Sequence, residues 1–518
     1  MRAFRRPVSV IAALGAAALL LTACGPVTTA DPTSTVQSST DSATSSTRPP
    51  AADAIPAGLE KFYKQKLKWT KCDEALECAK ITVPMDYSKP EGETMTLAMN
   101  KLPGKDAQGS LLVNPGGPGG SGLDLVKDAG TTLFGQDLQR SFDIVGFDPR
   151  GVGSSTPVKC ETAAEQDASR QEEFDTSTDA GLAILRKASA TYAAQCAQRT
   201  GPSLGFVDTK SAARDLDVMR ALLGDKQLNY LGYSYGTYLG AHYAELFPHN
   251  VGRLVLDGAL DPTLSDPEIT MDQAVGFENE IRAYMQDCLD SGNCPFTGNL
   301  EEALTQLRGV LDGVERTPML ATDGRKVPIN DFMNGFILPL YNNDSWFALT
   351  EALRNVIAGN VDDIQFFADL AAGREEDGSY PSNGNAAFSA INCLDYPMNP
   401  SIEAMRAQER ELIAAAPVFG KYTAFGAIGC QDWKYPPTGN PGVLKAAGAA
   451  PIVVVGTTGD PATPYKWAEA LAEQLDSAVL VTFKGHGHTA YGRSNECISN
   501  AVESYLIDGK VPADGLTC

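Results

Sequence analysis

The sequence predicts an α/β protein with a mostly parallel central sheet and a mainly helical cap inserted into it. Up to about residue 260, short apolar segments with strand character alternate with helix-like segments, which is typical of chains that build a parallel sheet. The strand rhythm then stops, and helix-like segments follow until about residue 438. Because strands resume only at Pro451, the helical stretch is predicted to be an insertion that covers the sheet.

Apolar runs and helical periodicity predict the strands and helices along the chain. The first strand candidates are 79–83, 94–101, 109–113, 142–147, 228–231 and 253–256, with helices at 182–199, 211–223 and 237–247. The cap candidates are helices at 271–289, 300–314, 346–358, 361–372 and 401–415. The last elements are strands 451–456 and 478–483 and a helix at 496–507. We therefore expect a core in two parts, residues 56–260 and 439–518, with the cap at 261–438.

The N-terminus carries an export signal. Arg2, Arg5 and Arg6 precede an apolar run over residues 8–21, which is too short to span a bilayer and ends in small residues. A signal peptide over 1–23 is therefore predicted. Leu21-Thr22-Ala23-Cys24 resembles the lipobox of bacterial lipoproteins, so we expect Cys24 to be acylated and to anchor the chain to the outer face of the cytoplasmic membrane. Ordinary cleavage that releases a soluble protein is the alternative.

Residues 24–55 are rich in Ser, Thr, Pro and Ala and cannot bury enough apolar surface to fold, so they are predicted to be a disordered tether. The formal net charge of the whole chain is −22. This charge argues against nucleic-acid binding and against direct adhesion to anionic lipid headgroups. Membrane attachment is therefore expected through Cys24 alone.

The cysteine count fits an oxidising compartment. Of eleven cysteines, ten remain when Cys24 is set aside, and they fall into couples that are near in sequence. Sequence does not prove connectivity, so the pairing is a hypothesis: Cys72 with Cys78, Cys160 with Cys196, Cys288 with Cys294, Cys393 with Cys430, and Cys497 with Cys518.

A candidate nucleophile lies between a strand and a helix. Gly232-Tyr233-Ser234-Tyr235-Gly236 follows the strand 228–231 and precedes the helix 237–247. In the G-x-S-x-G pattern, a strained turn raises the serine hydroxyl above the sheet edge, and strand and helix on either side are the context that it requires. We therefore predict that Ser234 is a nucleophile.

A serine needs a base, and the chain has only four histidines. His242 and His249 lie within and just after the helix that follows the serine, where they cannot easily turn back to it. His486 and His488 lie in a glycine-rich loop after the strand 478–483. We choose His488, because Gly487 lets the chain turn just before it, and keep His486 as the competitor. A metal site is disfavoured because no further histidine lies near, so neither metal nor cofactor is expected.

The acid that orients the base is expected between serine and histidine in the chain. Asp460 follows the apolar strand 451–456, where parallel sheets place functional groups. Thr463 and Pro464 fit the N-cap and first position of the next helix. Asp257, after the strand 253–256, is the alternative acid, although a buried carboxylate that braces its loop is the simpler interpretation.

Two backbone N–H groups should face the developing oxyanion. One is expected from Tyr235 and the other from Gly117, in the glycine-rich turn 114–122 after an early strand. The spacing Gly117-x-Gly119-x-x-Gly122 also matches a dinucleotide-binding fingerprint. We reject that interpretation because Pro118 interrupts the phosphate-binding turn and an exported protein meets no nicotinamide pool.

At this point a family resemblance is clear over residues 59–518. The chain resembles the exported serine aminopeptidases of the α/β-hydrolase superfamily, the tripeptidyl and prolyl aminopeptidase group, which includes cell-envelope lipoproteins. The segments that carry it are 114–122, 147–155, 232–236, 256–258, 459–464 and 485–489. Where relatives begin the oxyanion loop with histidine, this chain has Pro115, so that residue's contribution is absent.

The resemblance implies an α/β-hydrolase fold and a serine exopeptidase that acts on peptides or proteins with a free N-terminus. Such an enzyme needs a carboxylate for the substrate's ammonium, and Asp395 is the first candidate, before Glu278 and Glu280. Thr463 is expected to line the entrance or to cap its helix. An esterase or lipase with the same triad is the alternative function, and a ligand-binding lipoprotein with a decayed triad is a third. The oligomeric state is left open.

Overall fold

A computed structural model of the protein describes residues 54–518. The predicted signal peptide 1–23, the lipidation site Cys24 and nearly all of the tether 24–55 lie outside the described residues. The described part of the chain forms one compact unit. None of the helices within it combines the length and apolar character needed to cross a bilayer.

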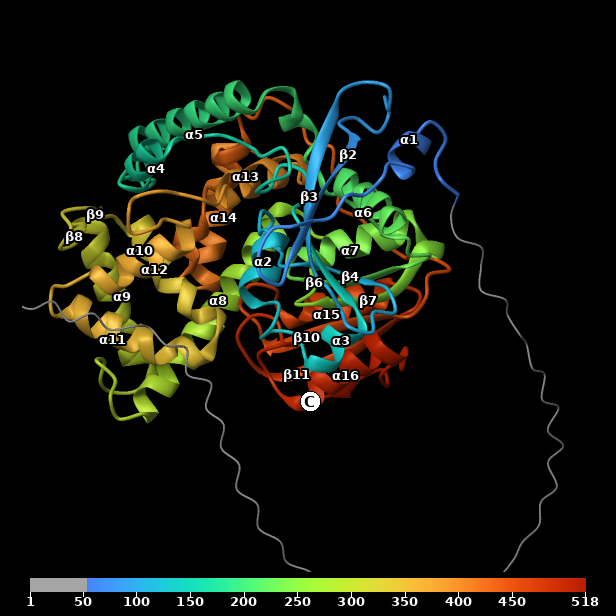
Figure 1. Ribbon diagram of the computed structural model, residues 1–518. Helices are drawn as coiled ribbons and strands as arrows, with labels where there is room; N and C mark the ends of the chain where they lie inside the picture. The colour runs from blue at the N-terminus through green and yellow to red at the C-terminus, as the bar shows by residue number, and fades with distance from the viewer. Residues whose placement is uncertain (1–53) are drawn as a thin grey trace, which may run out of the picture. The chain divides into compact units, whose positions relative to one another are not determined.

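The described residues build a ten-stranded sheet in the order β1-β2-β3-β5-β4-β6-β7-β10-β11-β12 (Figure 1). The strands are β1 (Thr70–Lys71), β2 (Glu77–Pro84), β3 (Thr94–Leu102), β4 (Ser110–Asn114), β5 (Asp143–Phe147), β6 (Leu228–Tyr233), β7 (Val251–Asp257), β10 (Ile452–Gly459), β11 (Ala478–His486) and β12 (Leu516–Thr517). The first three pair antiparallel with their neighbours, and β5 through β12 run parallel. The predicted fold class, a mostly parallel α/β sheet, is confirmed.

Successive side chains of a strand point to opposite faces of the sheet, so apolar strands present two apolar faces. Helices cover both of these faces. Leu111 and Val113 pack on one face with α2 (Gly122–Ala129), α3 (Gln136–Ser141) and α16 (Glu496–Asp508). Leu112 packs on the other face, whose helices are α1 (Glu60–Tyr63), α6 (Thr209–Leu223), α7 (Tyr235–Leu246), α13 (Gly384–Asp395) and α15 (Tyr465–Gln474). Both clusters continue through the central strands, so the parallel strands are buried on both sides.

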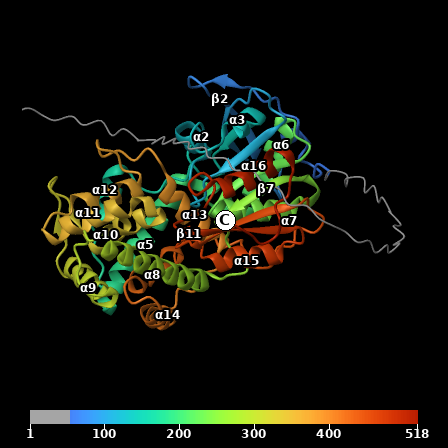
Figure 2. The same ribbon diagram turned by 90° about the horizontal axis from the view of Figure 1, so that it is seen from below.

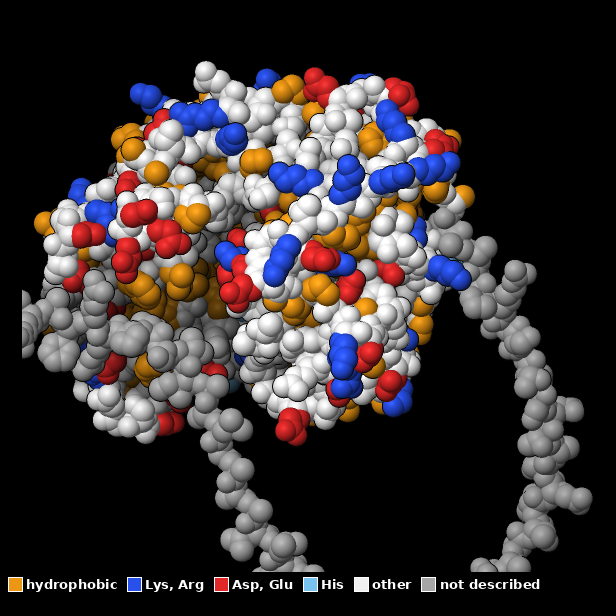
Figure 3. All heavy atoms as spheres, viewed as in Figure 1, with side chains coloured by type: hydrophobic (Ala, Val, Ile, Leu, Met, Phe, Trp, Pro, Cys, Tyr) orange, Lys and Arg blue, Asp and Glu red, His pale blue; other side chains and the backbone are white. Residues whose placement is uncertain are grey.

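The cap has a hydrophobic core of its own, beside the sheet (Figures 1 and 2). Its helices are α8 (Asp266–Asp290), α9 (Leu300–Arg316), α10 (Ile329–Ile337), α11 (Trp346–Ile357), α12 (Asp362–Ala372) and α14 (Ile402–Ala415), with a small hairpin of β8 (Met319–Leu320) and β9 (Lys326–Val327). In Figure 3 the surface between cap and core is hollowed, and hydrophobic side chains show in the hollow.

Three helices depart from the expected division at residues 261 and 438. Helix α13 lies inside the predicted cap segment, yet its apolar residues pack into the core beside the sheet. Conversely, α4 (Ala163–Arg170) and α5 (Asp179–Thr200) lie in the predicted core segment but reach the cap, where Leu182 packs against Met405 and Ile428. The placements of α13 and of α4–α5 both result from contacts between residues that are far apart in the sequence. Helical periodicity gives no information about such contacts.

All five cysteine pairs expected from sequence proximity are disulfides in the structure: Cys72–Cys78, Cys160–Cys196, Cys288–Cys294, Cys393–Cys430 and Cys497–Cys518. The pair Cys393–Cys430 ties the end of α13 to the segment after α14. The pair Cys497–Cys518 ties the last residue, just after β12, to the first turn of α16.

Candidate active site

Ser234 stands at a strained turn between β6 and α7. Its φ of 54° and ψ of −125° are unfavourable for a residue with a side chain, and such strain persists only where the surroundings enforce it. Asp257 does so from β7, because its carbonyl accepts a hydrogen bond of 2.9 Å from the Ser234 N–H. A Cβ on Gly236 would lie 2.8 Å from Asn114 Oδ1, so the position two residues after the serine has no room for a side chain.

His488 and Asp460 meet at the ends of neighbouring strands. His488 Nδ1 lies 2.9 Å and 3.0 Å from the two carboxylate oxygens of Asp460. The same carboxylate accepts N–H bonds from Ala462, Thr463 and Thr489, and only 4% of Asp460 is exposed. With its Nδ1 held there, the imidazole keeps Nε2 for a reaction partner.

Gly258 connects this pair to the serine. It directly follows Asp257, whose carbonyl holds the Ser234 N–H. A Cβ on Gly258 would lie 3.3 Å from His488 Cε1 and 3.1 Å from Thr463 Oγ1. The imidazole edge, Thr463 and the serine turn therefore gather at the carboxyl end of β7. The three residues predicted as nucleophile, base and acid are brought together at this edge of the sheet.

Thr463 lies between the predicted acid and base. Its hydroxyl donates a 3.0 Å hydrogen bond to Asp460 Oδ2 and lies 3.2 Å from His488 Nδ1. The expected helix-capping role is wrong, because α15 begins at Tyr465 with Pro464 as the residue before it, and the Thr463 side chain is engaged with the carboxylate instead. The alternative expectation is that Thr463 lines the entrance, and the structure places Thr463 on the wall of the cavity that contains Ser234.

The other histidines have separate surroundings. His486 Nδ1 lies 2.9 Å from Glu280 Oε2 of the cap, and its ring packs against Trp346 at 5.5 Å between ring centroids. His242 is buried within α7, where burial lowers its pKa to about 4. Asp460 thus contacts His488, while the competitor His486 is paired with a cap glutamate.

Asp257 is a buried carboxylate that braces a loop, as the simpler interpretation of the sequence predicts. Its carboxylate accepts N–H bonds from Ala490 (3.0 Å) and Tyr491 (2.7 Å), which follow the predicted base along the same loop. Burial raises the Asp257 pKa to about 6. The carboxylate holds the backbone of this loop, whereas Asp460 holds the imidazole.

The glycine-rich turn lies directly against the serine turn. A Cβ on Gly116 would come within 2.5 Å of the Tyr233 carbonyl oxygen and 3.1 Å of the Tyr235 nitrogen, and Gly116 has a φ of 93°. Gly117, Pro118, Ser234 and Tyr235 line one cavity. The two residues predicted to supply oxyanion N–H groups, Gly117 and Tyr235, therefore both border the space in front of the serine.

This cavity has a volume of about 1200 Å³ and lies between three parts of the chain. The core contributes the serine turn and Thr463, the cap contributes Phe277, Ile337 and Tyr341, and α5 contributes a long wall. A volume of this size holds a short peptide or another ligand of comparable bulk, since typical small-molecule pockets span about 300–1,000 Å³.

The structure corrects the placement of Asp395. It does not line the cavity: it is 3% exposed at the end of α13, and its two oxygens accept hydrogen bonds from the Thr209 N–H (2.9 Å) and hydroxyl (2.5 Å). Burial raises its pKa to about 7. Glu278 is likewise occupied, because it accepts the N–H groups of Val418 and Phe419. The carboxylates favoured by sequence are thus structural.

Sequence reasoning missed Asp266, at the first position of α8. It lines the cavity that contains Ser234, and burial raises its pKa. Among residues 54–518 its carboxylate has no hydrogen-bond or ion-pair partner. The motif Ser265-Asp266-Pro267-Glu268 indicates only a helix start, in which Glu268 completes a capping box with Ser265. No local signal distinguishes Asp266 from an ordinary first-turn acid.

Fold and site together define a serine hydrolase of the α/β-hydrolase class. Residues 416–518 match the family model described as TAP-like protein. The chain is 36% identical over 476 residues to serine protease Hip1 of Mycobacterium tuberculosis, covering 88% of this chain and 91% of that one. It is 37% identical over 488 residues to carboxylesterase B of the same species (91% and 93%). It is 31% identical over 490 residues to tripeptidyl aminopeptidase of Streptomyces lividans (90% and 88%). The chain therefore belongs to this family of α/β-hydrolases.

Proposed function

We propose that the protein is a serine aminopeptidase that releases short peptides, of the tripeptide type, from free N-termini. The proposal rests on Asp266, a partly buried carboxylate on the wall of the cavity that contains Ser234, for which residues 54–518 supply no hydrogen-bond or ion-pair partner. The names of two relatives, a serine protease and a tripeptidyl aminopeptidase, support the same substrate class.

In the proposed reaction, Ser234 Oγ attacks the scissile carbonyl carbon while His488 Nε2 takes its proton. Asp460 holds the Nδ1–H tautomer and stabilises the imidazolium that forms. The oxyanion of the tetrahedral intermediate accepts hydrogen bonds from the N–H groups of Gly117 and Tyr235. His488 then gives the proton to the leaving amine, which leaves the short peptide as an ester on Ser234.

Water completes the cycle by the same route. His488 Nε2 takes a proton from the water as it attacks the ester carbonyl, and returns that proton to Ser234 Oγ as the peptide acid leaves. Thr463 acts through its two partners, because its hydroxyl fixes the plane of the Asp460 carboxylate against the imidazole. It is a positioning residue in this scheme.

The substrate's ammonium would pair with Asp266. A carboxylate inside a partly enclosed cavity is desolvated, so a cation that reaches it gains more than it would at an open surface. The length of peptide between Asp266 and Ser234 then determines how many residues precede the cut bond. This supports an exopeptidase, because an internal peptide segment offers no ammonium to the same carboxylate.

An esterase is the second candidate, and a specific observation favours it. The cavity wall carries exposed apolar side chains, among them Ile184 and Phe388, which would suit an acyl chain. One relative is named carboxylesterase B. Ser234, His488 and Asp460 would have the same roles in ester hydrolysis, so the two functions differ only in what the cavity recognises.

One experiment separates these candidates. The purified mature protein is given tripeptide anilides, their N-acetylated forms and p-nitrophenyl acyl esters. We expect kcat/KM for the acetylated anilides to fall by about two to four orders of magnitude, since an unpaired buried charge costs roughly 3–5 kcal/mol. Equal cleavage of free and acetylated peptides, or turnover of esters alone, would contradict the aminopeptidase assignment.

We further propose that the protein is exported and anchored through lipids on Cys24. The short apolar run over residues 8–21 and the lipobox-like sequence before Cys24 support this. The five disulfides also suit an oxidising compartment. Replacing Cys24 by Ala should move the protein from the detergent phase to the aqueous phase in a phase-separation assay. Retention of the variant in the detergent phase would rule out this anchor.

A further inference from the structure

The α4–α5 segment, residues 163–200, forms a strap that runs from the core to the cap (Figure 1). Residues of both helices line the cavity that contains Ser234. Helix α5 has 22 residues, but only a few are buried: Gly181, Leu182, Ala193 and Cys196. One face of this helix, with Ile184, Ala188, Tyr192 and Gln195 at helical spacing, lines the cavity that contains Ser234. The strap is therefore a wall of the substrate cavity with little apolar anchorage.

The base of the strap is fixed to the core. The disulfide Cys160–Cys196 joins the chain before α4 to the last turns of α5. Arg199 adds hydrogen bonds to the Cys160 carbonyl (2.6 Å) and to Glu165 (2.6 Å) at the start of α4. This covalent and polar attachment holds one end of the strap in place whatever the other end does.

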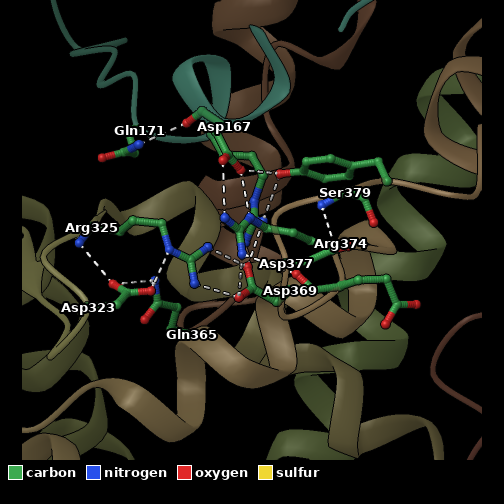
Figure 4. Close-up of polar contacts among 12 residues, drawn as sticks. Asp167, Gln171, Asp323, Arg325, Gln365, Asp369, Arg374, Asp377 and Ser379 are labelled. Atoms are coloured by element: carbon green, nitrogen blue, oxygen red, sulfur yellow. Dashed lines mark hydrogen bonds and ion pairs between the residues drawn. The ribbon is translucent and has the colours of Figure 1, made fainter. Parts of the chain in front are cut away.

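The far end is attached to the cap by an ion cluster. At the end of α4, Asp167 accepts two hydrogen bonds from Arg374 (2.7 and 3.1 Å), and Figure 4 shows these two side chains facing each other. Arg170 donates two to Asp331 of α10 (2.8 and 2.9 Å). It also contacts Asp369 of α12 at 2.7 Å. Two residues one turn apart thus connect the strap to two elements of the cap.

The cluster continues within the cap. Arg325, beside β9, makes two hydrogen bonds to Asp369 (2.8 and 2.6 Å), as Figure 4 shows. The side chains of Arg170 and Asp331 are 15% and 7% exposed, so they are largely withdrawn from water. Paired guanidinium and carboxylate groups in such a site are mutually dependent, and removal of one leaves the other uncompensated. We call Asp167, Arg170, Asp331, Asp369 and Arg374 the latch.

Apolar contact between strap and cap is limited to one small cluster around Leu182, with Met405, Phe425, Ala427 and Ile428. The remaining attachment is polar. This polar attachment comprises the latch and bonds from other parts of the strap, namely Glu173 with Lys326, the Thr176 carbonyl with Arg406, and Arg186 with Gln431. The latch is its most buried part, so the position of α4, and with it the volume in front of Ser234, depends most on the latch.

We propose that the latch holds the strap closed and thereby sets the largest substrate that reaches Ser234. With the latch intact, short peptides fit the closed cavity and bulky chains are excluded. With the latch broken, the strap swings on its fixed base and admits them. The inference rests on the proposed acyl transfer at Ser234, and is independent of whether the cavity prefers a free amine or an ester.

The test compares access for small and bulky reagents. Second-order inactivation rates are measured with a compact ethyl fluorophosphonate and with a fluorophosphonate attached to a long dye-labelled peptide. We expect Arg170→Gln to raise the bulky-to-small rate ratio about tenfold or more, because the accessible open state becomes more populated. Lys421→Gln is the matched control, since Lys421 forms ion pairs with Asp312 and Glu315 of α9, neither of which belongs to the strap. It should leave the ratio unchanged.

Amide hydrogen exchange provides a second readout that does not depend on chemistry at Ser234. Protection of α4 and the start of α5 should fall in Arg170→Gln, while protection of α9 stays as in the wild type. If Arg170→Gln fails to fold, the double variant Arg170→Gln/Asp331→Asn replaces it, because it leaves no unpaired charge. An unchanged rate ratio with unchanged strap protection would overturn the proposal, as would equal acceleration of both reagents. If the wild type reacts with neither reagent, the acyl-transfer assignment fails and exchange alone decides the latch.

Discussion

Ser234 acquires its predicted reactivity from three residues that are distant from it in the chain. The Asp257 carbonyl holds its N–H, Gly116 presses against its turn, and His488 reaches the same strand end. None of these residues is near Ser234 in sequence. The strained backbone at Ser234 is therefore a property of the assembled sheet edge, although the motif that permits it is local.

Replacing Ser234 by Ala should abolish turnover and leave the fold intact. Loss of a triad nucleophile costs on the order of a millionfold in kcat. Anilide hydrolysis and fluorophosphonate labelling measure the loss, and thermal unfolding provides the control for folding. A variant that keeps its activity and its labelling would exclude Ser234 as the nucleophile.

The two loop histidines form a matched pair for mutation. His488→Ala should be about as damaging as loss of the serine, because the triad acts as a unit. His486→Ala should keep most of its kcat, since its partner is Glu280 of the cap and not Asp460. Steady-state kinetics on one anilide compares them. The opposite order of activities would move the base to His486.

Asp266 should determine the preference for a free amine. In Asp266→Asn, the ratio of kcat/KM for free over acetylated tripeptide anilide should fall by about tenfold or more, because the ion pair with the ammonium is lost. Fluorophosphonate labelling should stay near the wild-type rate. Asp395→Asn is the control, since Asp395 is buried against Thr209 and should leave the ratio unchanged. If Asp395→Asn alone lowers the ratio, the anchor has been assigned to the wrong carboxylate.

Among the elements, the strand ends do most to position the site. Asp257 ends β7, and Asp460 and the loop with His488 follow β10 and β11; these three strands are parallel neighbours in the sheet. The carboxyl ends of parallel strands meet at one edge, so groups distant in sequence arrive together. The last strand of this edge, β12, pairs with β11 and is tied to α16 by Cys497–Cys518.

Removal of this last disulfide should destabilise the protein without changing its chemistry. For a closed loop with a sequence separation of 21, the chain-entropy model gives roughly 3 kcal/mol of unfolding free energy. Denaturant unfolding of Cys497→Ser/Cys518→Ser measures it. The shorter pair Cys72–Cys78, with a separation of 6, should show a smaller loss when replaced in the same way. An unchanged unfolding midpoint for the first variant would contradict the expectation.

For the whole molecule, two buried carboxylates make stability depend on pH. Burial raises the pKa of Asp257 to about 6 and that of Asp395 to about 7, from an ordinary value of 3.8. The folded state therefore binds these protons more tightly than the unfolded state does. Their contribution to the unfolding free energy is complete below about pH 4 and is lost as the pH rises through 6 to 7.

Asp395→Asn tests this dependence, because it removes one of the two titrating groups. The difference in Tm between variant and wild type should shift in favour of the variant as the pH rises from about 5 to about 8. Thermal unfolding at four pH values across that range measures the difference. A Tm difference that is constant over the range would show that Asp395 titrates as in the unfolded chain.

The sequence determined those parts of the protein that have a local signature. Strand and helix segments followed from apolar runs, and the G-x-S-x-G turn followed from glycines beside a serine. Functional groups of parallel sheets lie beyond the carboxyl ends of the strands, which predicts an acid and a histidine after later strands. The structure has Asp460 and His488 together at these positions. The disulfide pairing could also be predicted from the sequence, because each bridge joins cysteines that are near in sequence.

Which carboxylates are engaged in hydrogen bonds, and where the cap ends, depend on contacts that form only in the folded protein. Asp395 pairs with Thr209, which is 186 positions earlier, whereas Asp266 lines the cavity and finds no partner within the described part of the chain. Likewise, Arg170 reaches Asp331 across 161 positions and makes α4 part of the cavity wall. The physical reason is the same in each case. The state of a charged side chain depends on desolvation and on partners brought near by folding, and neither has a counterpart in the local sequence.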